Sequence, residues 1–409
     1  MKITNLRTSA KGNLARVSAT VIWEDRDRPH QDIYFETTAE FASDLSCNPH
    51  AFLLACIIPA LHYGEKRLAL DAPICPELRE GLVTAMSLIR HWYGYNRPLV
   101  KIEAPLQSHP PTRSTPPRTA FFYTGGIDSL ANLRVNRLNF PLSHPLSIKD
   151  GLLVYGLQDT TRENFEKIVN SLTALAQEAQ IQLIPVYTNI SSHIRDLEYI
   201  EGKYNYDWRF WIFEFIGSAL AAVAHAFSSR LTTVSISSSD DIPQLAPLGS
   251  HPLLDPNYSS YDLQIRHDGI SLSRLAKTKI VADWDLALAH LRVCDWQKLP
   301  PGLFNCGQCE KCLRTMTALV ALGALEKTRV FPQTDVSQDL LLAGVNIDGL
   351  DVEASYLELI PLLNQKGRQD LVRAIQHLST RYREKDWKGW LKRFDRTIFK
   401  GNLRHLIKK

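Results

Sequence analysis

The stretch that decides the fold is Thr119–Leu130, TAFFYTGGIDSL. Thr119–Tyr123 has the apolar composition of a buried strand, and Ser129–Val135 can open a helix. Two adjacent glycines, an aspartate and a serine lie between them. Glycines let the backbone adopt positive φ and approach a ligand closely, and N–H groups at a helix start bind anions. The stretch therefore predicts either a structural turn or a cradle for phosphate.

Strand-like and helical segments alternate along the chain after this stretch. The strands are expected at Leu152–Leu157, Gln182–Tyr187 and Leu231–Ser235, and the helices at Arg162–Gln177 and Trp208–Phe227. Such alternation predicts an α/β fold, a doubly wound and mostly parallel sheet with helices on both faces. Ligands bind such sheets at the carboxyl ends of the strands, which is where the glycine turn lies.

The polar residues of the turn supply what a phosphate site needs. We expect Thr124, Gly125, Gly126, Asp128 and Ser129 to contact the phosphates of a nucleotide, through backbone N–H groups and hydroxyls. The Asp128 carboxylate can hold Mg²⁺ against phosphate oxygens. The pattern is neither a Walker loop nor GxGxxG.

T-G-G-I-D-S resembles the SGGxDS pyrophosphate loop of the N-type ATP pyrophosphatases, with Thr124 in place of the usual serine. The resemblance implies an adenine nucleotide alpha hydrolase-like fold, ATP and Mg²⁺ as cofactors, and cleavage of ATP to AMP and pyrophosphate. It also implies catalytic roles for Asp128 and Ser129.

Four cysteines gather late in the chain, in the spacing C-x11-C-x2-C-x2-C: Cys294, Cys306, Cys309 and Cys312. Short C-x2-C turns present two thiolates to one ion, and four thiolates make a closed, structural Zn²⁺ site. An iron–sulfur cluster or redox-active thiols are the alternatives. The remaining cysteines, Cys47, Cys56 and Cys75, have apolar neighbours and are expected to be buried thiols.

Together the two motifs resemble the 7-cyano-7-deazaguanine synthase branch of the same superfamily. That branch pairs its loop with a C-terminal CGxCxxC zinc site, followed closely by an arginine, as Arg314 follows here. Lys277, ahead of Ile280-Val281, matches a family lysine that contacts phosphate or leaving pyrophosphate. The resemblance implies adenylation of a substrate carboxylate or amide oxygen, followed by attack of ammonia or an amine. The gap from Cys294 to Cys306 is wider than the family's.

Composition shifts predict four segments. Residues 1–107 read as an α+β domain, with strands at Ala15–Trp23 and Asp32–Thr37 and helices at Ala51–His62 and Pro76–Trp92. Residues 108–118, SHPPTRSTPPR, are a stiff linker. Residues 119–324 carry the nucleotide fold and the cysteines, and residues 325–409 form a helical, basic region.

The charge is concentrated at the C-terminal end. From Lys366 to Lys409 there are 14 Lys and Arg against 4 Asp and Glu, in a chain of net charge +4. This tail could contact nucleic acid or a membrane surface, or pack on the acidic remainder. No apolar run reaches the length of a membrane span, and no signal peptide is evident. We therefore expect a cytoplasmic protein. The resemblance implies a small-molecule or peptide carboxylate as substrate, and we expect a homo-oligomer.

Two rival functions stay open at this point. One is a tRNA-modifying enzyme in which a cysteine carries sulfur, and the other is a nucleotide-binding protein without catalysis.

Further candidate substrate contacts lie in the polar segment Gly249–Arg274, namely His251, Asp255, His267, Asp268 and Arg274. Asp207 is expected to cap the helix that starts at Trp208.

Overall fold

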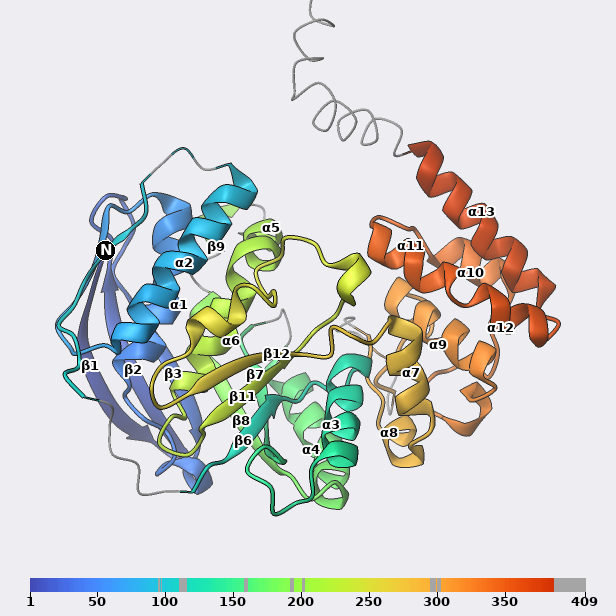
Figure 1. Cartoon of the computed structure of the whole chain (residues 1–409), viewed down its shortest axis with the longest axis horizontal. Coiled ribbons are helices and arrows are strands. Elements are labelled where there is room, and N and C mark those ends of the chain that lie inside the picture. The colour runs from blue at the N-terminus through green and yellow to red at the C-terminus, as the bar shows by residue number, and fades with distance from the viewer. Residues whose placement is uncertain are drawn as a thin grey trace, which may run out of the picture. The chain divides into compact units, whose positions relative to one another are not determined.

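The computed structural model of this chain describes residues 1–94, 96, 98–109, 116–157, 161–191, 195–200, 203–294, 299 and 303–385. The chain divides into two compact units, Met1–Ser271 and Leu272–Lys409. Each unit is described by itself below (Figure 1).

The first unit is built on a ten-stranded sheet. The strand order is β12-β11-β6-β7-β8-β3-β2-β1-β4-β5 (Figure 1). The bounds are β1 Lys2–Lys11, β2 Leu14–Ile22, β3 Gln31–Thr38, β4 Arg67–Leu70, β5 Lys101–Glu103, β6 Thr119–Phe122, β7 Ile148–Tyr155, β8 Gln182–Thr188, β11 Thr233–Ser237 and β12 Gln264–Asp268. A separate hairpin joins β9, Arg195–Ile200, to β10, Lys203–Tyr206.

The five strands from β12 to β8 are all parallel. In chain order they are β6, β7, β8, β11 and β12, so their order across the sheet is 5-4-1-2-3. The chain leaves β6 toward β7 and β8 on one side, and later adds β11 and β12 on the other. This reversal makes the carboxyl end of β6 a topological switch point, the place where doubly wound sheets bind ligands. The predicted parallel α/β arrangement is confirmed for this part of the chain.

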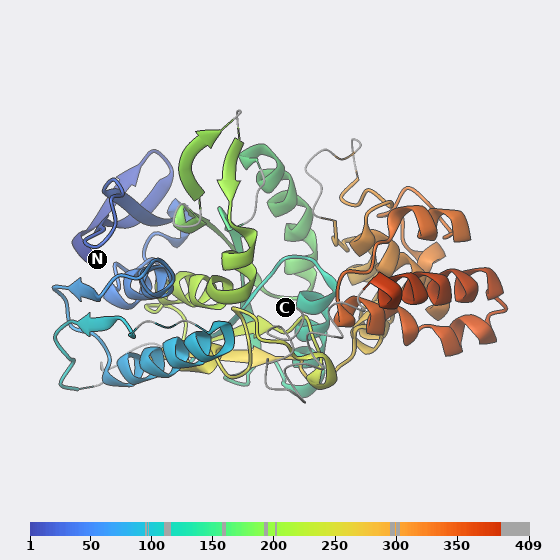
Figure 2. The ribbon, with the colours of Figure 1, turned by 90° about the horizontal axis from the view of Figure 1, so that it is seen from above.

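Helices cover both faces of the parallel strands (Figure 2). The helices of this unit are α1 Pro49–Tyr63, α2 Pro76–Tyr93, α3 Ile127–Asn139, α4 Arg162–Glu178, α5 Trp208–Phe210 and α6 Ile216–His225, with a π-helical segment, Trp211–Phe215, between the last two. Helix α3 packs on β6, β7 and β11, and α4 on β7 and β8, whereas α6 packs on β11 and on α1. The predicted cap Asp207 is confirmed, because its carboxylate accepts from the N–H groups of Arg209 and Phe210.

Side chains of successive strand residues point to opposite faces. Ala120 and Phe122 of β6 belong to the core that includes α1 and α6. Phe121 and Tyr123 point the other way and contact each other at 5.3 Å between ring centroids. Gly151 of β7 fits beneath them, since a Cβ there would lie 2.9 Å from Cβ of Tyr123.

The N-terminal residues extend the same sheet and do not form a domain of their own. Strand β3 pairs antiparallel with β8, with Phe35 opposite Thr188, and Thr37 Oγ1 donates to the Pro185 carbonyl at 2.7 Å. The sequence analysis placed domain boundaries at residues 107–119 and 324–325, whereas the two units divide after Ser271. The pairing of β3 with β8 is non-local, and the local composition of residues 1–107 carries no sign of it.

A buried ion-pair cluster ties the amino ends of the parallel strands together. Asp150 of β7 is fully buried and accepts from the guanidinium groups of Arg118 and Arg230. Arg230 also reaches Asp44, at 2.8 Å. Of the predicted linker, residues 110–115 lie outside the described residues, and its last residue, Arg118, anchors the start of β6.

Among its described residues, the second unit contains helices and connecting segments but no strand. Its helices are α7 Arg274–Ala282, α8 Asp285–Ala289, α9 Glu310–Leu322, α10 Gln338–Gly344, α11 Leu350–Leu357, α12 Ile360–Gln365 and α13 Gln369–Lys385. Helix α9 packs against α7, α10, α11 and α12. The basic tail beyond Lys385, which the sequence analysis singled out, lies outside the described residues.

Candidate functional site

The glycine turn directly follows the central parallel strand. The Tyr123 N–H still donates to the Leu152 carbonyl of β7, at 2.9 Å. Gly125 then has φ of +74°, in the left-handed region that favours glycine. Gly126 is the N-cap of α3, which begins at Ile127. Strand, turn and helix therefore follow one another in the order expected of a phosphate-binding turn.

Hydroxyl groups of Thr124 and Ser129 fix the shape of the turn. The Gly126 N–H donates to Thr124 Oγ1 at 3.3 Å, and Thr124 Oγ1 donates to Ser129 Oγ at 3.2 Å. Ser129 Oγ donates in turn to the Gly126 carbonyl at 3.1 Å. Thr124 is exposed and Ser129 is buried, so the threonine is the hydroxyl that a ligand reaches from solvent.

Helix α3 starts without a side-chain cap on its N-cap residue, Gly126. The first turn of a helix carries N–H groups without intrahelical partners and the positive end of the helix dipole. Asp128, half-buried, lies in this first turn. The turn thus combines backbone donors, a reachable hydroxyl and a carboxylate at the switch point, a set that suits an anion accompanied by a divalent cation.

A polar network lies beside the turn, on the face of the sheet that α3 covers. Asn132 of α3 donates through Nδ2 to Ser235 Oγ at 2.8 Å and to Ser237 Oγ at 3.0 Å. Ser235 Oγ donates to Asp268 Oδ2 at 2.6 Å, and Arg266 donates to Asp268 Oδ1 at 2.9 Å. We call these five residues the β11–β12 network. Of its members, the sequence analysis named only Asp268.

His267 points to the opposite face from Asp268. Its Nδ1 lies 2.7 Å from Asp255 Oδ2, and both side chains are almost completely buried. Asp255 also accepts from Ser250 Oγ, at 2.7 Å, and His251 lies beside it, with its N–H 3.4 Å from Asp255 Oδ1. These candidates therefore form one buried cluster that holds the segment before β12 in place, away from the turn.

Lys277 and Arg274 belong to α7 of the second unit. Lys277 is 2% exposed, an unusual burial for a lysine. Arg314 of α9 lies 3.3 Å from Glu310, one helical turn away. The glycine turn belongs to the first unit, so the contact of Lys277 with phosphate stays a prediction.

The four cysteines come together in the second unit. Their sulfur atoms all lie within 4.8 Å of one another, with 3.8 Å between Cys294 and Cys309 and 3.8 Å between Cys306 and Cys312. Thiolates at about 2.3 Å from one zinc ion in a tetrahedron lie about 3.8 Å apart. The group can therefore hold a metal ion such as zinc, as the spacing predicted.

The turn between Cys306 and Cys309 has the shape that a metal-binding C-x2-C segment needs. Cys306 Sγ accepts from the N–H groups of Gln308 and Cys309, at 3.4 and 3.2 Å. Gly307 between them has φ of +70°, and a Cβ there would lie 1.9 Å from Oε1 of Gln333. Only glycine fits this position without displacing a neighbour.

Helix α9 contributes the last ligand, Cys312, from its first turn, with Cys309 as its N-cap. The hydrogen bond with Cys294 raises the pKa of Cys309 to about 12. Cys309 is therefore a neutral thiol at neutral pH without a metal ion, and a bound cation would supply the charge that favours its thiolate.

Asn305 joins the two segments that carry the cysteines, and the sequence analysis missed it. Its Oδ1 accepts from the N–H groups of Val293 and Cys294, at 2.8 and 3.2 Å. Its Nδ2 donates to the carbonyls of Leu291 and Val330, at 2.8 and 3.1 Å. The side chain is fully buried, so this amide sets the position of Cys294 relative to the other three ligands.

Comparisons with known proteins leave the superfamily open. No protein-family model matches the chain, and neither the curated proteins nor the solved structures contain a significant match. The strand order and the two sites therefore stand on the chain's own geometry.

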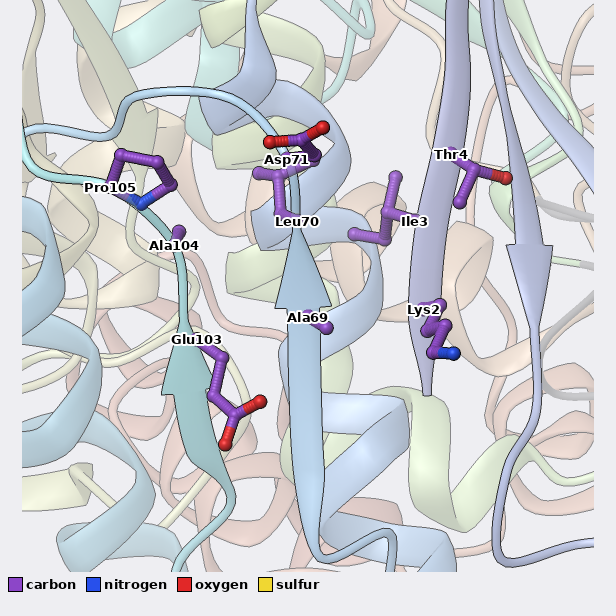
Figure 3. Close-up of a pocket in the computed structure, with 9 residues that line it drawn as sticks. All are labelled: Lys2, Ile3, Thr4, Ala69, Leu70, Asp71, Glu103, Ala104 and Pro105. Carbon is purple, nitrogen blue, oxygen red and sulfur yellow. The ribbon is translucent and has the colours of Figure 1, made fainter.

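Two further observations concern the helices and the surface of the described residues. None of the helices in the described part of the chain has the length and apolar composition needed to cross a membrane. A depression between β1, β4 and β5 is lined by Lys2, Asp71 and Glu103 together with Thr4 and apolar residues (Figure 3). Glu103 is already paired with Arg67 and Lys101, and four strands separate β1 from β6 in the sheet.

Proposed function

We propose that this chain is an ATP-dependent enzyme of the N-type ATP pyrophosphatase kind, which splits ATP to AMP and pyrophosphate and adenylates a substrate oxygen. The observation that carries the proposal is the position of Thr124–Ser129. The T-G-G-I-D-S turn lies at the carboxyl end of the first strand of a 5-4-1-2-3 parallel sheet and runs directly into α3.

In this proposal the turn holds the phosphates of ATP. The backbone N–H groups at the start of α3 donate to phosphate oxygens, and the Thr124 hydroxyl turns its proton from Ser129 Oγ to a phosphate oxygen when ATP binds. Asp128 holds Mg²⁺, which offsets the charge on the phosphates. Catalysis then comes mainly from positioning and charge stabilisation.

The acceptor is a carboxylate or amide oxygen, as the resemblance to 7-cyano-7-deazaguanine synthases implies. For a carboxylate, one oxygen forms a bond to the α-phosphorus and the bond from that phosphorus to the bridging oxygen of the β-phosphate breaks. Pyrophosphate leaves with the electron pair, and no proton moves in this step. Ammonia or an amine then displaces AMP from the adenylate.

The metal site supports the proposal because its ligand set is that of a structural site. Four thiol ligands leave no position for water or substrate, which suits a structural zinc ion. All four thiols lie within 4.8 Å of one another, a packing that favours a closed metal site over a free cysteine that carries sulfur.

The decisive test combines metal analysis with ATP-dependent pyrophosphate release, measured with a small-molecule extract as the source of acceptor. We expect about one zinc per chain and pyrophosphate release that Asp128→Ala lowers by at least 100-fold, because the carboxylate holds the cation that neutralises the phosphates. Glu163→Ala is the matched control. Glu163 also lies in the first turn of a helix, α4, but it is exposed and pairs with Lys167.

Other outcomes separate the rival functions. Nucleotide binding without pyrophosphate under any condition would favour a non-catalytic binding protein. Iron in place of zinc, together with RNA binding, would favour a sulfur-transferring tRNA-modifying enzyme.

A further inference from the structure

The β11–β12 network ends at the same edge of the sheet as the glycine turn. Ser237 and Asp268 are paired neighbours at the last positions of β11 and β12. Ser235, two residues earlier, lies opposite Phe121 of β6, two residues before Tyr123. Asn132 lies on α3 one turn after Asp128. The network and the turn are thus built on the same strand ends and the same helix.

The network fixes the orientation of one cationic group. The carboxylate of Asp268 accepts a hydrogen bond from Ser235 on one oxygen and from Arg266 on the other. The Arg266 guanidinium extends along β12 to Asp268, so it lies level with the end of the strand. Its side chain remains 37% exposed, and that of Asp268 27%. A guanidinium has five N–H donors, and the bond to Asp268 uses one of them.

Two other members of the network keep hydrogen-bonding groups that the bonds within the network do not use. Asn132 donates to both serines through Nδ2, so its Oδ1 faces away from them. Ser237 accepts from Asn132, which leaves the proton of its hydroxyl to be donated elsewhere. A planar, oriented guanidinium with a hydroxyl donor beside it matches a carboxylate, which accepts two parallel N–H bonds.

We propose that Arg266, oriented by Asp268 and accompanied by Ser237, binds a carboxylate group of the acceptor substrate at the carboxyl ends of β11 and β12, on the same edge of the sheet as the glycine turn. This inference rests on the proposed function, because the bound carboxylate is the group that supplies the oxygen that attacks the α-phosphorus. Two parallel N–H bonds hold the carboxylate, and each of its oxygens keeps a further lone pair with which it can form the new bond. The acceptor class is accordingly a carboxylic acid and not a neutral amide.

The test measures protection of Arg266 from phenylglyoxal, an arginine reagent, on the full-length protein by mass spectrometry. The probes are acetate, benzoate, nicotinate and glutarate, and the neutral controls are the corresponding amides. We expect at least one carboxylate to slow labelling of Arg266 threefold or more, with no effect of its amide. Arg79, an exposed arginine on α2 paired with Glu80, serves as the internal reference and should label at an unchanged rate.

A second readout keeps the proposal decidable if the ion pair with Asp268 blocks labelling. The same carboxylates should raise the melting temperature of the wild-type protein and of Arg79→Met, but not of Arg266→Met. Equal labelling with and without every carboxylate, equal protection by amides, or the same melting shift in Arg266→Met would each overturn the proposal.

ATP binding, followed by equilibrium dialysis on the same samples, separates this inference from the proposed function. Carboxylate protection without ATP binding would leave an anion site and remove the adenylating enzyme. ATP binding without any protection of Arg266 would keep the enzyme and remove the acceptor site assigned here.

Discussion

At the scale of single residues, Gly125 carries the strongest conformational requirement in the site. Its φ of +74° costs other residues about 1–2 kcal/mol. The N–H groups that follow it can face a phosphate only if the chain turns at this position. The direction of these N–H groups depends on the backbone conformation at Gly125. A polar residue at this position would therefore not substitute for glycine.

We predict that Gly125→Ala weakens ATP binding about tenfold or more, because about 1.4 kcal/mol of strain corresponds to a factor of ten. Equilibrium dialysis with labelled ATP measures the effect. Gly94→Ala is the control, since Gly94 also has positive φ, 67°, with no atom within 4 Å of the added Cβ. Equal affinities in the two variants would mean that the turn does not contact the nucleotide.

Asn305 acts on the metal through the backbone of its ligands. We predict that Asn305→Ala speeds zinc release to a chelator about 10–100-fold, the range found when groups that orient metal ligands are removed. Release is followed with a colorimetric chelator. Asn364→Ala, which removes an exposed amide of the same unit bonded to Gln369, should release zinc at the wild-type rate.

At the scale of elements, the packing of α1 on α6 buries two histidines without charge. The His50 and His225 rings meet edge to face at 5.5 Å between centroids. His50 Nε2 accepts from the Cys75 N–H, and His225 Nε2 bonds to the Tyr258 carbonyl. Burial lowers the pKa of His225 to about 3, with a further contribution from His50, and burial also lowers the pKa of His50.

This pair predicts acid sensitivity. Between pH 6.5 and about 3 the unfolded chain binds a proton at residue 225 that the folded chain does not, so the free energy of unfolding falls as the pH is lowered. From pH 6.5 to pH 5 the loss from His225 is about 2 kcal/mol. Urea unfolding at pH 7.5, 6 and 5 measures it. His225→Asn should show a shallower pH dependence than the wild type, and identical slopes would refute the assignment.

The elements also explain which parts of the site could be predicted from the sequence. The glycine turn and the four cysteines are local patterns, and their residue types limit the chemistry. Asn132 meets Ser235 and Ser237 across more than 100 residues, and no local pattern gives that contact. The sequence nevertheless contains a signal that each of these strands has a polar face. Hydroxyl residues recur at every second position of TVSIS, Thr233–Ser237, and polar residues recur in the same way in QIRHD, Gln264–Asp268.

At the scale of the whole molecule, the N-terminal strands extend the sheet that carries the glycine turn. Strand β3 pairs with β8, and α1 contributes to the core shared with α6. The boundary after residue 107 was predicted from the proline-rich segment, which is visible in the local sequence. The continuation of the sheet depends on pairing between distant strands, which the local sequence does not show. A boundary drawn there cuts through one hydrophobic core.

We therefore predict that a chain starting at residue 116 does not fold into a stable domain. Removing residues 1–115 exposes the edge of β8 and the apolar face of α6, and such surfaces lead to aggregation. Circular dichroism and size-exclusion chromatography give the readout. A soluble, cooperatively melting fragment would show that the N-terminal strands are dispensable for the fold.

The measurement that tests the central claim most directly is ³¹P NMR of ATP and Mg²⁺ incubated with the protein and a small-molecule extract. The account predicts AMP and pyrophosphate in equal amounts, formed by the wild type and by Glu163→Ala but not by Asp128→Ala. Formation of ADP and phosphate, or the same products in Asp128→Ala as in the wild type, would contradict it.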